Sequence, residues 1–240
     1  MAYSGQEIHN PVSGERITFL KTAADTEGEL LEFELTLAPD GHVPGLHVHP
    51  YQEERFKVVD GAMRFQRGFR TVKAGAGDEI AIPARTAHRF ENAGEQAAVV
   101  VVEVRPALKM EQLLETAAAL AREGRTNAAG MPKPHDLALF MREFSREVRA
   151  PFLPPSLVAF TLAPLAWMGR RRGLDRRYAT LGQPARRPAP VLRPSVANAY
   201  RGAAPPGGRP DFGAPQTIRL DSEVSRRPAG QRRASTRKQR

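Results

Sequence analysis

Apolar and polar side chains alternate along much of the first hundred residues. In the segments 32–37 (EFELTL) and 54–59 (ERFKVV) one side of the chain is mainly apolar and the other is polar, which is typical of half-buried strands. The β-branched run at 97–104 (AAVVVVEV) predicts a buried strand. Asp60-Gly61 and residues 75–78 (GAGD) supply turns. Because short strands recur with no helical pattern among them, we predict an all-β core of the sandwich or jelly-roll barrel type.

After Pro106 the pattern becomes helical. Residues 109–123 carry leucine and alanine at helical spacing, and Gly124 suits the end of that helix. Residues 136–149 place an apolar stripe opposite charged side chains. The stripe consists of Leu137, Phe140, Met141, Phe144 and Val148. We interpret this stripe as a surface that packs against the barrel or against a partner chain.

A third helical segment, residues 156–168 (SLVAFTLAPLAWM), is apolar nearly all round and is followed by three arginines. It is shorter than the roughly 20 residues that span a bilayer, and Pro164 interrupts it. We therefore predict burial against the barrel or at a homodimer interface. The alternative is contact of residues 156–177, helped by the arginines, with a membrane surface.

The positive charge of the chain lies at its C-terminal end. The whole chain has a formal net charge of +10, and residues 183–240 hold 13 Lys or Arg against 3 Asp or Glu, which accounts for all of it. Residues 1–182 are therefore neutral overall, which gives no electrostatic support for a nucleic-acid role of the folded part. Because the tail is rich in Arg, Pro and Gly, we predict that it is disordered. An acidic partner could bind its basic end.

The composition also bears on location. With 41% hydrophobic residues, the 240-residue chain can build one sizeable core. It has no cysteine, so it lacks disulfides and thiolate ligands, and this is compatible with a reducing cytoplasm. The N-terminus, MAYSGQEIHN, has no basic stretch followed by an apolar one, so no signal peptide is apparent. We expect a cytoplasmic protein.

The candidate chemistry lies in four residues. His47 and His49 are two apart, so on an extended chain both point to one face. Glu54 begins the next predicted strand and His88 follows later. Two readings are open: an exposed polar face, or a cage for a divalent metal. Glu53 competes with Glu54, but Glu54 shares its face with the apolar residues of its strand, where a buried carboxylate needs a compensating partner.

Two motifs in this region resemble those of the cupin family. Residues 41–61 (GHVPGLHVHPYQEERFKVVDG) fit the first motif throughout, and residues 77–92 (GDEIAIPARTAHRFEN) fit the second except that Arg85 replaces the usual glycine. The resemblance implies a cupin double-stranded β-helix over residues 1–107. A helical C-terminal extension over 108–182 and the disordered tail over 183–240 would follow it.

The resemblance also implies a function for the four residues. His47, His49, Glu54 and His88 match the metal-ligand positions of the two motifs. Three imidazoles and a carboxylate suit divalent Fe, Mn, Ni, Co or Zn. We expect a metal-dependent enzyme, dioxygenase-like or isomerase-like, that acts on a small organic molecule, with Glu54 also a candidate general base. The alternative is a non-catalytic module that binds or senses a small ligand.

Two further residues near the second motif concern the cavity. Phe90 shares the face of His88, so we expect it to line the cavity. Arg85 has two readings: it points to solvent, or it meets an anionic substrate at the barrel mouth.

Overall fold

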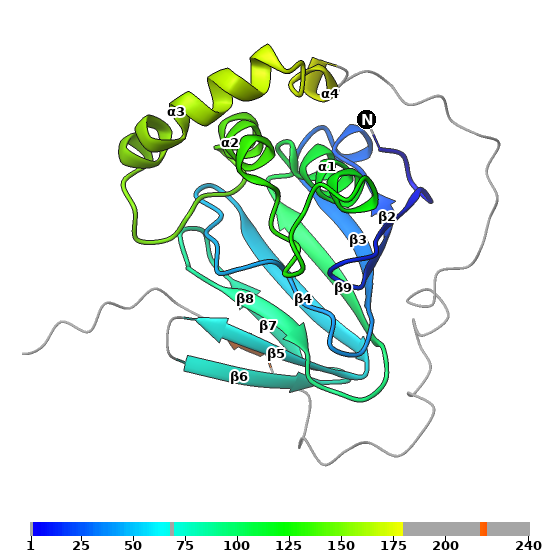
Figure 1. Cartoon of the computed structure of the whole chain (residues 1–240). Helices are drawn as coiled ribbons and strands as arrows, with labels where there is room; N and C mark the ends of the chain where they lie inside the picture. Colours follow the sequence, from blue (N-terminus) through cyan, green and yellow to red (C-terminus); the bar gives the residue numbers. More distant parts are fainter. Residues whose placement is uncertain (1, 68–69, 180–216, 220–240) are drawn as a thin grey trace, which may run out of the picture.

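The structure, a computed structural model, describes residues 2–67, 70–179 and 217–219 (Figure 1). Its strands are β1 (Glu7–Asn10), β2 (Glu15–Lys21), β3 (Leu31–Leu37), β4 (Glu53–Asp60), β5 (Ala62–Arg67), β6 (Arg70–Gly75), β7 (Glu79–Ile82), β8 (Arg89–Asn92), β9 (Ala98–Arg105) and β10 (Thr217–Arg219). Its helices are the 3-10 turn η1 (Ala24–Thr26), α1 (Met110–Arg122), α2 (Pro134–Glu143), α3 (Pro155–Arg171) and α4 (Arg176–Ala179).

The strands form two sheets, as the all-β prediction requires. The larger sheet has the order β1-β2-β3-β9-β4-β7-β10, and the smaller has the order β6-β5-β8. The pairs within both sheets are antiparallel except β10 with β7, which is parallel. Phe56 on the larger sheet and Phe65 and Phe90 on the smaller sheet meet with ring centroids 5.1 to 6.1 Å apart. This aromatic cluster joins the two sheets in the core.

The alternation in the sequence holds on one predicted strand and not on the other. In β4, Glu54, Phe56 and Val58 are buried while Arg55 and Lys57 are exposed. In β3, however, the predicted polar face is buried as well, including Glu32 and Glu34. β3 lies inside the sheet between β2 and β9. The Lys21 ammonium pairs with the Glu32 carboxylate at 2.7 Å, which compensates part of that burial.

The helices gather at one side of the strands (Figure 1). The predicted helix at 109–123 is observed as α1, but the one predicted at 136–149 ends at Glu143. Beyond that point the backbone of Arg149 exchanges two hydrogen bonds with that of Val48, at 2.9 and 3.0 Å. This pairing with the barrel replaces the last predicted helical turns.

The third helix differs from the prediction of burial against the barrel. α3 lies outside α2 (Figure 1) and buries only Ala166 and Gly169 fully. Gly169 leaves room for Leu139 of α2: a Cβ at this glycine would lie 3.0 Å from the Leu139 Cδ1. No helix in the described part of the chain is long and apolar enough to cross a bilayer.

Most of the tail, predicted to be disordered, lies outside the described residues. Its residues Thr217–Arg219 differ from that prediction, because they form β10 beside Glu79–Ala81 of β7. The half-buried side chain of Ile218 packs against the main hydrophobic core. This short segment therefore extends the larger sheet by one strand.

Candidate metal centre

The structure brings the four candidate residues together inside the barrel. One potential ligand atom from each of His47, His49, Glu54 and His88 lies within 4.8 Å of the others. His49, Glu54 and His88 are buried, and His47 is half-buried. Three histidines and a carboxylate at these distances form a possible site for a divalent metal.

Backbone pairing, rather than a regular strand, positions the histidines. His47 and His49 lie in a segment of isolated bridges between β3 and β4. The His47 N–H donates to the His88 carbonyl at 3.0 Å, and the His88 N–H donates to the His47 carbonyl at 2.9 Å. The predicted same-face geometry nevertheless holds, since the rings of His47 and His49 are 4.8 Å apart. Those of His47 and His88 are 4.4 Å apart.

Each histidine ring is held through its Nδ1 atom by a backbone carbonyl. Gly45 accepts from His47 at 3.2 Å, Glu147 from His49 at 2.5 Å, and Thr86 from His88 at 2.9 Å. Because a carbonyl only accepts, each neutral ring carries its proton on Nδ1 and keeps a lone pair on Nε2. Carbonyl contacts of this kind orient metal-binding histidines.

The Nε2 atoms of His49 and His88 both face the Glu54 carboxylate, which makes the site fit a metal. The Nε2 atom of His49 is buried and has no hydrogen-bond partner among the described residues. Its nearest carboxylate oxygen, Oε2 of Glu54, is 3.4 Å away. The same Glu54 oxygen lies 2.9 Å from Nε2 of His88. A buried nitrogen lone pair without a donor is costly, and a cation between these atoms would satisfy it.

Glu54, not Glu53, is the carboxylate of the site. Glu53 is half-buried and its carboxylate accepts from the Arg55 guanidinium at 2.8 Å. Burial alone would raise the pKa of Glu54, but His49 and His88 outweigh it and hold this pKa well below 4.5. The carboxyl group is therefore ionised at neutral pH, as a metal ligand must be.

The pKa values of two histidines move in opposite directions. Burial, reinforced by His88 and His49, lowers the pKa of His47 well below 6.5, so its ring is neutral at pH 7. Burial also acts to lower the pKa of His49, but the Glu54 charge and the Glu147 carbonyl raise it overall. Without a metal, Glu54 and His49 thus compensate each other's burial.

A cavity of about 300 Å³ adjoins the site, and His47, His49 and Glu54 are part of its wall. The barrel supplies apolar side chains including Phe33, Leu35, Phe56 and Phe90. The helical extension supplies Leu113, Leu137, Phe140, Met141 and Val148. Phe90 thus lies where the sequence predicted. Phe140 and Phe144 of the stripe at 136–149 pack against Leu120 of α1, within the extension, and the stripe also contributes part of the cavity wall.

Two residues of the site carried no signal in the sequence. Glu147 acts through its backbone carbonyl, which any residue possesses, and Arg149 lines the cavity only because its backbone pairs with Val48. Arg85 is exposed and is not part of the cavity wall, in agreement with the solvent-pointing reading. Its φ of +67° is in the left-handed region that the expected glycine would favour.

Residues 33–104 match the family model of the cupin domain. Residues 33–104 are therefore a cupin domain. The match spans β3 to β9 and contains all four residues of the cluster. Its boundary falls just before the helices, so the wall that the extension contributes to the cupin cavity lies outside the match. No curated protein matches the sequence significantly.

Several solved structures resemble this cupin distantly. KdgF from Halomonas sp. is 16% identical, with 42% of this chain and 88% of that one covered and a TM-score of 0.37. A predicted oxalate decarboxylase from Thermotoga maritima is 21% identical, with 44% and 98% covered and a TM-score of 0.39. A sugar phosphate isomerase from Silicibacter pomeroyi is 22% identical, with 39% and 60% covered and a TM-score of 0.35. These values carry no information about what this chain acts on.

Proposed function

We propose that this cupin is a metal-dependent enzyme that acts on a small, largely apolar organic molecule. The observation that supports it is the orphaned Nε2 atom of His49, which faces the Glu54 carboxylate beside an apolar cavity. His47, His49, Glu54 and His88 would hold one divalent ion of Fe, Mn, Ni, Co or Zn. When bound, the ion would supply a Lewis-acid or redox centre.

The residues around the cluster favour an apolar substrate. Phenylalanine, leucine and methionine side chains from both barrel and helices dominate the cavity wall. Its few ionisable side chains outside the cluster are Glu15 and Arg149. A cavity of about 300 Å³ accepts only a small ligand. We propose enols, phenols and diketones as substrates, with oxygen insertion the leading reaction and isomerisation the next.

Glu54 has two possible roles in this reaction. As a ligand it needs to be ionised, which its lowered pKa ensures. As a general base it needs a pKa nearer to the working pH, so the surroundings favour the ligand role. Glu54→Gln separates the two: retained metal with lost turnover indicates a base, whereas loss of the metal indicates a ligand.

A second candidate is a non-catalytic cupin that binds or senses a small ligand. The scarcity of ionisable side chains in the cavity supports it, because proton transfer would have few groups to use. The two candidates differ in one measurable respect: the sensing module binds its ligand without converting it.

The test begins with the metal. Elemental analysis of the purified protein and of protein reloaded with each metal should give about one ion per chain. The His47→Ala and His88→Ala variants should lose it, while His135→Ala, outside the cluster, should keep it. Absence of metal from both preparations would contradict the proposal. Oxygen uptake and product analysis over small phenols, enols and diketones then separate enzyme from sensor.

Removal of the metal gives an independent readout. Because the ion binds the folded state, a free concentration 100-fold above Kd adds about 2.7 kcal/mol to the free energy of unfolding. A chelator should therefore lower the melting temperature of the wild type. The melting temperature of His88→Ala should not respond.

A further inference from the structure

The exposed large apolar side chains of this protein are concentrated in one segment. Of the seven among the described residues, six lie between Phe152 and Met168, and the seventh is Tyr51. Phe152 is 82% exposed, Phe160 79% and Trp167 50%. Scattered exposed apolar residues are ordinary, but a contiguous group marks a contact surface. We call the six exposed side chains between Phe152 and Met168 the α3 face.

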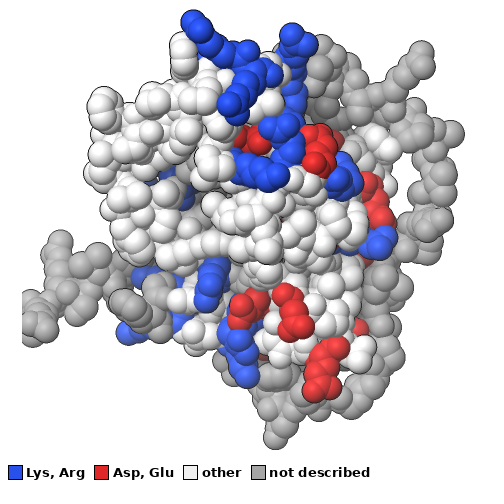
Figure 2. All heavy atoms as spheres, in the orientation of Figure 1, with Lys and Arg blue, Asp and Glu red and all other residues white. Residues whose placement is uncertain are grey.

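The α3 face carries no charge, which is unusual for an exposed helix. Residues 150–169 contain no Asp, Glu, Lys or Arg. Immediately after them come Arg170, Arg171 and Arg172, and Arg176 follows; all four are exposed. Figure 2 shows this division, with a nearly uncharged surface along α3 at the upper left and arginines at the top.

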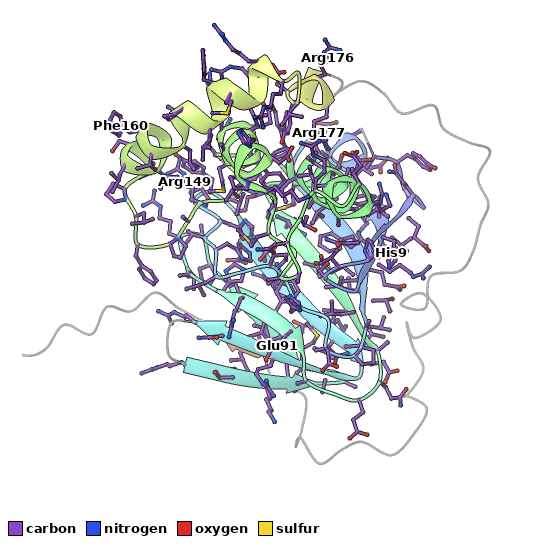
Figure 3. All side chains as sticks on the ribbon, viewed as in Figure 1. His9, Glu91, Arg149, Phe160, Arg176 and Arg177 are labelled. Atoms are coloured by element: carbon purple, nitrogen blue, oxygen red, sulfur yellow. The ribbon has the colours of Figure 1, made fainter. Side chains whose placement is uncertain are left out.

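The helix is oriented so that the apolar side chains project outward. Ala166 and Gly169 face α2, and Val158 and Leu162 line the wall of the metal cavity. Phe160 points away from the body of the molecule, and Arg176 lies at the far end of the same layer (Figure 3). One side of α3 thus lines the metal cavity, and the side chains of the α3 face project from its other side.

The arginines determine which partner fits. Within the part of the chain that the structure describes, Arg170, Arg171, Arg172 and Arg176 form no ion pair. Arg171 instead stacks over the Trp167 ring at 4.2 Å. A second copy would bring an identical face, which has no acidic residue between positions 148 and 174 to meet these arginines. An anionic surface with an apolar interior complements both parts at once.

We propose that the α3 face docks on the surface of an anionic phospholipid bilayer. Leu157, Phe160 and Trp167 would enter the boundary between headgroups and acyl chains, and the arginines would contact the lipid phosphates. The helix lies in the plane of the membrane and does not cross it, in keeping with its 17 residues. The proposal does not depend on the metal or on catalysis.

Trp167 makes the test direct, because it is the only tryptophan of the chain. The full-length protein is mixed with vesicles of phosphatidylcholine and phosphatidylglycerol whose acyl chains carry bromine. We expect the Trp167 emission to shift to shorter wavelength and to be quenched by the bromine. With phosphatidylcholine alone, binding should be much weaker.

Two sets of variants identify the side chains that bind the membrane. The double variant Leu157→Ser/Phe160→Ser should bind at least about tenfold more weakly, since each apolar side chain is worth more than one factor of ten when buried. Replacement of Arg170, Arg171 and Arg172 by Gln should also weaken binding. The matched control replaces Lys57, Arg70 and Lys73, exposed on the strands, by Gln and should bind like the wild type.

Two outcomes would overturn the proposal, and neither depends on the variants folding. If the wild type sediments with anionic vesicles but Trp167 is not quenched by brominated chains, the basic tail alone makes the contact. If the Trp167 emission shifts with protein concentration in the absence of vesicles, and light scattering reports a dimer, then a second copy covers the α3 face.

Discussion

The ring of His49 is held by a residue 98 positions further along the chain: its Nδ1 atom donates to the carbonyl oxygen of Glu147 at 2.5 Å. Glu147 follows α2 and is almost fully buried. Its side chain accepts from the backbone N–H of Lys109 at 3.1 Å, just before α1. A ligand of the candidate metal centre is thus oriented by the helical extension, so the extension is part of the site.

This relationship predicts the behaviour of Glu147 variants. Glu147→Ala leaves the Lys109 N–H without its acceptor and loosens the segment that carries the carbonyl. We expect metal affinity to fall by about 10–100-fold, the usual effect of losing support for a ligand, while the fold persists. Metal titration followed by circular dichroism measures both quantities.

Glu147→Gln is the matched control, because its amide oxygen can accept the same hydrogen bond. It should bind metal nearly as well as the wild type. Equal affinities for the wild type and Glu147→Ala would mean that the Glu147 side chain is not needed to hold the carbonyl against His49.

The cluster was predictable from the sequence because its chemistry is local. The two-residue spacing of His47 and His49 keeps their rings together even without a regular strand, and period two on β4 selects Glu54 over Glu53. Glu147 was not predictable, since its contact uses a backbone carbonyl brought in by the tertiary fold. A sequence pattern reports side chains and carries no record of such contacts.

The helical part was only partly predictable for a related reason. The apolar stripe at 136–149 is real, but the helix ends at Glu143, and Arg149 then pairs with the backbone of Val48. For α3, apolar composition predicted burial against the barrel or at a homodimer interface. The structure does not bury it against the barrel and leaves most of the helix exposed on the chain, and the homodimer interface stays a prediction. Composition shows that a surface favours an apolar contact and does not show what provides it.

Glu15 should make stability depend on pH. Burial raises the pKa of this carboxyl group above 4.5, although the Ser13 hydroxyl donates to it and His42 also acts to lower it. The folded protein therefore keeps the proton to a higher pH than the unfolded chain does. Glu15 contributes its full stabilisation below the pKa that it has in the unfolded chain. This contribution is lost as the pH rises through its pKa in the folded protein.

We expect the Glu15→Gln variant not to lose this stability as the pH rises. The free energy of unfolding of the variant, relative to the wild type, should rise as the pH increases from about 4.5 toward neutrality. Denaturant titrations at several pH values measure it. Glu95→Gln, which removes an exposed carboxylate, serves as the control, and a constant difference between Glu15→Gln and wild type would contradict the assignment.

Arg85 adopts a conformation that costs free energy. Its φ is +67°, and its N–H donates to the His49 carbonyl at 2.8 Å. For a residue with a Cβ atom, a positive φ costs roughly 1–2 kcal/mol of folding free energy. Glycine avoids this cost but loses more backbone entropy on folding, which costs roughly 0.4–1 kcal/mol. Arg85→Gly should therefore raise the free energy of unfolding by up to about 1 kcal/mol, measured by denaturant titration. Arg89→Gly, at an exposed position of β8 without positive φ, should lower it.

Two truncations test whether β10 belongs to the fold. A chain that ends at Leu220 keeps Thr217–Arg219, which pair with β7, and a chain that ends at Gly182 loses them together with the half-buried Ile218. We expect the shorter chain to lose about 1 kcal/mol of stability, seen as a melting temperature lower by about 2–4 °C.

Both chains should keep the metal, because none of the four ligands pairs with β10. Identical melting temperatures would show that β10 adds nothing, and loss of the metal only from the shorter chain would show that the tail supports the site.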